Sequence, residues 1–144
     1  MIAKIDELLG KPCWLVDIFP RRAPRRDDGR YFKVEEIFRR NRWELNEKLD
    51  ENFCRLLLKL YCYYDFCCVF GEERAENPEP ELLAEWLDRC LAGGERFAVL
   101  LPACDALICL DGGDLYANVY NPDEEFCGLL AQLAAAEGLF FRKS

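Results

Sequence analysis

A chain of 144 residues with 51% hydrophobic side chains has the size and apolar content of one folded domain, residues 1–144. It contains no His and no Thr, and its only Ser is Ser144, which excludes Ser-His and Cys-His catalysis, Walker A loops and His-containing zinc sites. The net charge of −8 divides into +4 over residues 1–42 (eleven Lys and Arg against seven Asp and Glu) and −12 over residues 43–144 (eight against twenty).

The pattern of apolar residues and cysteines predicts a cytoplasmic protein. No apolar run approaches the roughly 18 to 20 residues that a membrane-spanning helix needs, and the first ten residues lack the pattern of a signal peptide. Most of the nine cysteines lie among Leu, Phe, Tyr or Ala, where a free thiol behaves as a small apolar group. We therefore expect buried, reduced thiols at Cys54, Cys62, Cys67, Cys68, Cys90, Cys109 and Cys127.

The first third of the chain predicts a helix and two strands. Residues 1–10 have the spacing of a short amphipathic helix, and 12–19 read as a buried strand that Pro20 ends. Residues 30–38 read as a second strand, so we expect a hairpin whose long tip is the basic segment between them.

The rest of the chain alternates irregularly between helices and strands. We expect helices over 43–60, from Pro80 to Gly93, and from an Asn121 cap to Gly138. We expect a central strand over 61–70, an acidic loop over 71–77, strands over 97–101, 106–110 and 115–120, and an edge strand over 139–141. The Asp111-Gly112-Gly113-Asp114 segment predicts a tight hairpin turn. The fold class is therefore α+β, a mostly antiparallel sheet of about five to seven strands with about four helices packed on it.

One candidate site is the arginine loop, residues 21–26, with four guanidinium groups in six residues. Guanidinium groups favour carboxylate and phosphate, so an anion-binding loop is predicted at Arg21, Arg22, Arg25 and Arg26. A solvated loop is the alternative, since charge runs are commonly surface features. The acidic remainder of the chain disfavours nucleic acid and anionic membranes as partners.

A second candidate site is an acidic surface. Carboxylates of one sign attract basic proteins, and the predicted protein-binding residues are Glu72, Glu73, Glu76, Asp111 and Asp114. The oxygen-rich stretch from Asp111 to Asp123 does not have the order of an EF-hand, and turns and helix caps explain its residues. We expect no metal and no other cofactor.

These features favour a non-catalytic binding protein over an enzyme. A small acidic α+β domain without catalytic residues is similar, in class, to the immunity proteins that neutralise bacterial toxins, which implies an inhibitor; the acidic charge makes a basic protein its expected target. The alternative is a small enzyme or ligand-binding protein that uses a carboxylate such as Asp65 or a thiol such as Cys67, with a pKa raised by burial.

Overall fold

A seven-stranded antiparallel sheet organises the protein. The computed structural model describes residues 1–40, 47–93, 95–112 and 114–144. Within them the strand order is β3-β2-β4-β5-β6-β1-β7, and every neighbouring pair is antiparallel. The strands are β1 (Cys13–Asp17), β2 (Cys67–Phe70), β3 (Glu73–Glu76), β4 (Phe97–Leu101), β5 (Ala106–Leu110), β6 (Tyr116–Tyr120) and β7 (Phe140–Lys143). The predicted α+β fold with an antiparallel sheet is confirmed.

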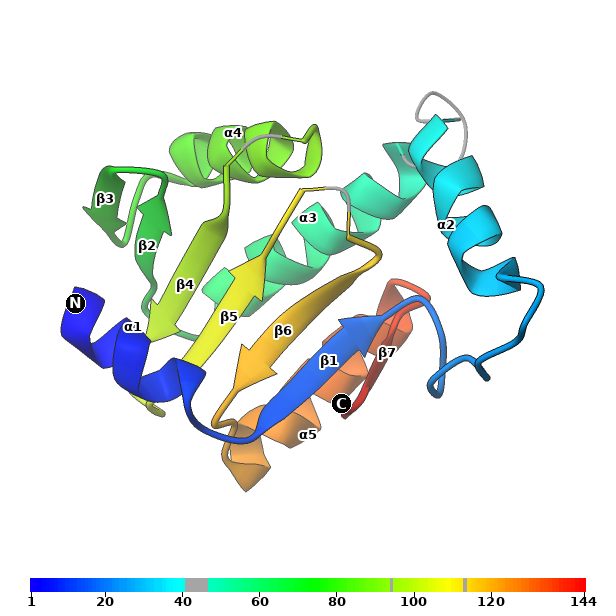
Figure 1. Cartoon of the computed structure of the whole chain (residues 1–144). Coiled ribbons are helices and arrows are strands. Elements are labelled where there is room, and N and C mark those ends of the chain that lie inside the picture. The colour runs from blue at the N-terminus through cyan, green and yellow to red at the C-terminus, as the bar shows by residue number, and fades with distance from the viewer. Residues whose placement is uncertain (41–46, 94, 113) are drawn as a thin grey trace.

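Helices cover the two faces of the sheet unequally (Figure 1). Three helices pack on one face around the main core, while α1 packs on the other and buries Ile5 and Leu8 against β4 and β5. The remaining helix, α2, stands beside the sheet, and none of its described side chains is fully buried. The helices are α1 (Ile2–Leu9), α2 (Arg30–Arg40), α3 (Glu47–Tyr61), α4 (Pro80–Leu91) and α5 (Glu124–Ala136).

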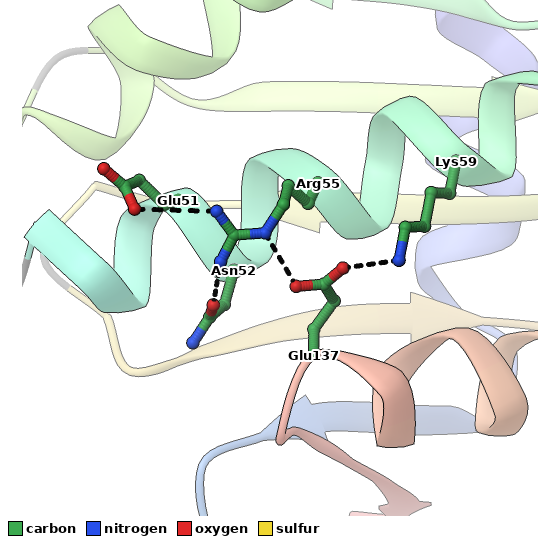
Figure 2. Close-up of polar contacts among 5 residues, drawn as sticks. All are labelled: Glu51, Asn52, Arg55, Lys59 and Glu137. Carbon is green, nitrogen blue, oxygen red and sulfur yellow. Dashed lines mark hydrogen bonds and ion pairs between the residues drawn. The ribbon is translucent and has the colours of Figure 1, made fainter.

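An ion-pair network joins α3 to the C-terminal end of α5 (Figure 2). The Glu137 carboxylate accepts hydrogen bonds from Lys59 Nζ at 2.7 Å and from Arg55 Nε at 2.8 Å. Arg55 also contacts Glu51 and Asn52, its neighbours on α3. The Glu137 side chain is only 7% exposed, and the hydrogen bonds from Lys59 and then Arg55 lower its pKa.

Residues 30–38 are helical, so the predicted second strand and its hairpin with residues 12–19 are wrong. The strand β1 pairs instead with β6 and β7. The helix α2 begins after Gly29, which has φ 66°, and the Asp28 carboxylate accepts the backbone N–H of Arg30 at 3.0 Å. The aromatic and β-branched content of the segment favoured a strand, but its half-buried residues Tyr31, Val34 and Phe38 repeat at the three- and four-residue spacing of a helix face.

The region 61–77 also differs from the prediction. Tyr61 is the last residue of α3, and its hydroxyl donates to the Pro78 carbonyl at 2.7 Å. Only the second half of the predicted strand forms β2, which lies next to the edge rather than in the centre of the sheet. The edge strand is β3, which forms from residues that were expected to be an acidic loop. Its backbone pairs with the N–H and C=O groups of β2 that would otherwise have no partner in the sheet.

The predicted C-terminal helix and strand form, but the residue that caps the helix is Asp123 and not the expected Asn121. The α5 cap is Asp123, whose carboxylate accepts the Phe126 N–H at 2.8 Å; Asn121 has φ 58° and donates from its side chain to the Asp105 carbonyl. The predicted edge strand is confirmed as β7. Residues 43–46 of a predicted helix, Gly94 and Gly113 lie outside the described residues.

Candidate functional site

The strand register gathers polar side chains on the sheet face that α1 leaves open. Asp17 pairs with Tyr116 of β6 across one side of β1, and Leu15 pairs with Arg142 of β7 across the other. Since alternate residues of a strand share a face, Leu15, Asp17, Tyr116 and Arg142 lie on the same side of the sheet. This polar row begins where β1 ends and the arginine loop starts.

A buried ion pair forms part of this row. Asp17 is 4% exposed and is the only charged residue in the buried core of the described residues. Its Oδ2 atom lies 2.7 Å from Arg142 Nη2, and the Arg142 side chain is 17% exposed. The Nε atom of Arg142 is buried and has no hydrogen-bond partner within the described part of the chain. Buried N–H groups are nearly always paired in folded proteins, so this donor requires an acceptor.

A pocket of about 840 Å³ lies between the polar row and the segment that follows β1. Its floor comes from β1, β6 and β7, and its wall comes from the arginine loop and the first turn of α2. Asp28 fixes this wall, because its carboxylate accepts from both the backbone N–H and the Nη2 of Arg30. The lining residues are Leu15, Asp17, Phe19, Arg22, Ala23, Pro24, Arg25, Arg26, Gly29, Arg30, Tyr31, Phe32, Tyr116, Arg142 and Ser144.

Positive charge dominates the pocket lining. Five arginines line it, against Asp17 as the single acidic residue. Two of them are already paired, Arg142 with Asp17 and Arg30 with Asp28. The other three are exposed and make no ion pair with any residue in the ranges described: Arg22, Arg25 and Arg26. The structure thus brings three of the four predicted anion-binding arginines together; Arg21 is exposed outside the lining.

Two tyrosines contribute neutral hydroxyl groups to the pocket. Burial raises the pKa of Tyr31, and the carboxylates of Glu35 and Asp17 raise it further. Burial likewise raises the pKa of Tyr116, with Asp114 and Glu35 adding to the effect. Both phenols are therefore protonated at neutral pH, and each can donate or accept a hydrogen bond.

The predicted acidic residues are divided between two ends of the sheet. The pairing of Phe70 with Glu73 and Phe97, and of Phe97 with Leu110, puts Glu72, Glu73 and Asp111 at one end. Asp114 precedes β6 at that end as well. Glu76, paired with Cys67, lies at the other end of β3. Asp111 forms an ion pair with Arg96 at 2.9 Å, whereas all three glutamates are exposed.

The two residues named for an enzymatic reaction lie apart from the pocket. Asp65 is exposed in the segment that leads into β2. Cys67 is half-buried; burial, then Glu76 and Asp65, raise its pKa, which keeps the thiol protonated at neutral pH. Neither side chain has the environment of an activated catalytic group.

All nine cysteines lie in the described segments and are free thiols. Burial raises the pKa of Cys54 and Cys68 to about 12, and the pKa of Cys90 and Cys109 to about 11. Cys62 is exposed, which corrects the expectation that it is buried. Among residues 1–40, 47–93, 95–112 and 114–144, no three Cys, Asp or Glu side chains converge to hold a metal ion. No described helix has the length and apolar character to cross a bilayer.

Comparisons with protein-family models, with curated proteins and with solved structures give no match to this chain. The pocket therefore has to be interpreted from its own residues. Sequence reasoning missed Asp17, Arg30, Tyr31, Tyr116 and Arg142. Asp17 had a usable signal, as a carboxylate within the apolar run 12–19, whereas Tyr116 and Arg142 join the site only through strand pairing.

Proposed function

We propose that this protein is a non-catalytic binding protein whose pocket holds a small anionic ligand with phosphate or carboxylate groups. One observation carries the proposal. In a chain with net charge −8, the pocket is lined by five arginines, and three of them have no carboxylate partner among the described residues. Guanidinium groups form paired, charge-assisted hydrogen bonds with the oxygens of such anions.

The surroundings of these arginines support the same ligand class. The first turn of α2 lies in the pocket wall, and the amino-terminal end of a helix favours negative charge. The guanidinium group of Arg142, which Asp17 holds in place at 2.7 Å, adds a further positive charge to the lining. The volume falls within the range of about 300 to 1,000 Å³ that is typical of small-molecule pockets.

Isothermal titration calorimetry with orthophosphate and pyrophosphate tests this proposal. The double variant Arg25→Gln/Arg26→Gln should bind both anions at least about tenfold more weakly, because two charge-assisted hydrogen-bonding groups are lost. The matched control is Lys11→Gln/Arg74→Gln, which removes the same charge at exposed positions outside the pocket. Absence of binding to the wild type at millimolar anion, or an equal loss in the control, contradicts the proposal.

A second proposal retains the acidic surface as a binding site for a basic protein. The observation that favours it is the position of Glu72, Glu73 and Asp111 at one end of the sheet. An inhibitor or immunity-like protein would use such a surface to attract its target. The anion pocket ranks first, because it combines residues from three strands, a loop and a helix, whereas the acidic surface depends on exposure and charge alone.

A further inference from the structure

Four aromatic side chains line the pocket together with the five arginines. Phe19, Tyr31, Phe32 and Tyr116 all line it. The rings of Phe19 and Tyr31 are 6.0 Å apart, and Tyr31 meets Phe32 edge to face at 5.6 Å. Phe32 is 72% exposed, so it contributes little to the core and presents its ring to solvent at the pocket. A ligand with only anionic groups would leave these rings unused.

We infer that the ligand carries a planar aromatic group in addition to its anionic group, and that it belongs to the class of free mononucleotides. This inference rests on the proposed function. A single phosphate held by Arg22, Arg25 and Arg26 fills a small part of an 840 Å³ pocket. The same pocket is also lined by Phe32, Tyr31 and Tyr116, and a base gains affinity by stacking on such rings.

The hydrogen-bonding groups of the pocket complement a nucleotide in two places. The unpaired guanidinium groups match the phosphate. The tyrosine hydroxyls, protonated at neutral pH, match the donors and acceptors on a base or sugar.

The charge of the whole chain favours a free mononucleotide over a nucleic-acid strand. A strand longer than the pocket would extend beyond the arginine-lined region onto a chain whose overall charge is −8, where further phosphates would meet net repulsion. A mononucleotide places its negative charge inside the pocket alone. The unpaired arginines of the pocket are thus sufficient to bind one mononucleotide, although the chain as a whole is acidic.

The test compares whole nucleotides with their parts. The probes are AMP, GMP, CMP and UMP, together with ribose 5-phosphate, each titrated calorimetrically into the full chain. At least one nucleotide should bind about tenfold more tightly than ribose 5-phosphate, the contribution expected of one stacked base. Phe32→Ala should remove most of that gain and leave ribose 5-phosphate affinity within about twofold. Tyr63→Ala, which truncates a 63% exposed aromatic ring outside the pocket, is the matched control and should change neither.

The outcomes separate this inference from the proposed function. Orthophosphate binding without any advantage of a nucleotide over ribose 5-phosphate overturns the inference and leaves the anion pocket in place. A Phe32→Ala variant that weakens both probes equally also overturns it, since the ring would then shape the pocket and not contact a base. A short single-stranded oligonucleotide is titrated as a further probe. If it binds more tightly than every mononucleotide, the inference that the ligand is a free mononucleotide is contradicted. If neither orthophosphate nor any nucleotide binds, the proposed anion pocket and the mononucleotide inference both fail.

Discussion

Individual carboxylates with little solvent exposure are held by cations in two different settings. Asp17 lies on the sheet and pairs with Arg142, and this pair is part of the proposed pocket. Glu137 lies at the end of α5 and pairs with Lys59 and Arg55 of α3, away from the pocket (Figure 2). Only the second is a purely structural contact between elements, so its contribution to stability can be measured without changing ligand binding.

Glu137→Gln should destabilise the protein by roughly 1 kcal/mol at pH 7, since both cations are half-exposed and solvent weakens the pairs. That loss corresponds to a fall in Tm of about 2 to 4 °C for a domain of this size. The matched control is Glu85→Gln on the exposed side of α4, which should leave Tm nearly unchanged. A Glu137 variant as stable as this control would show that the network contributes nothing.

The same residue gives a pH dependence with a defined sign. The hydrogen bonds in the folded state lower the pKa of Glu137 below its ordinary value of 4.5. Near that pH the carboxyl group therefore carries fewer protons on average in the folded chain than in the unfolded chain. Its stabilisation is complete above pH 4.5 and is lost as the pH falls through the lowered pKa. The difference in Tm between wild type and Glu137→Gln should therefore shrink in acid, and a difference that grows would contradict the sign.

At the scale of elements, the sequence predicted best where one local rule sufficed. The α4 segment has helical spacing with Pro80 in its first turn, and the strands β4 and β5 are short apolar runs; all three form as expected. Residues 30–38 were assigned wrongly because aromatic content was weighed above the three- and four-residue spacing of Tyr31, Val34 and Phe38. The strand β3 could not be predicted from its charged residues, since it forms by pairing with β2.

The candidate site, like the fold, was predictable only where a local pattern in the sequence marks its residues. Three pocket arginines follow from their density in the sequence, whereas Tyr116 and Arg142 reach the pocket through pairing of β1 with β6 and β7. Such pairing joins residues about a hundred or more positions apart, and no local pattern specifies it. The arginine loop is therefore the part of the pocket lining that the sequence alone singles out.

Replacing all four arginines of this loop with Ser should change the free energy of unfolding by less than about 1 kcal/mol. The four side chains are exposed, and exposed charges without ion pairs add little to stability. Denaturant unfolding of wild type and variant measures the difference. A larger loss would show that the loop is folded against the body through its guanidinium groups, and the weaker anion binding of arginine variants would then have a structural cause.

Across the whole molecule, charge is separated between two regions of the sheet. Arginines surround the pocket beside β1 and β7, while exposed glutamates lie around β2 and β3 at the opposite edge. A molecule with this distribution presents a positive pocket and a negative surface at once. The two surfaces can bind different partners, and charge changes at one should leave binding at the other intact.

The last prediction concerns the negative surface and its proposed basic protein partner. Attraction between exposed charges is screened over about 8 Å at physiological ionic strength, so association through this surface should slow steeply as salt is raised. The experiment captures interacting proteins from a lysate at low salt and then measures their association rates with the purified chain. Glu72→Gln/Glu73→Gln should slow association by several fold with a smaller change in dissociation, because charges at a rim mainly steer encounter. The control Glu124→Gln/Glu125→Gln removes the same charge at the start of α5, beyond the opposite end of β6, and should have little effect. Equal rates for both variants and the wild type, or rates independent of salt, would show that the acidic surface does not direct binding.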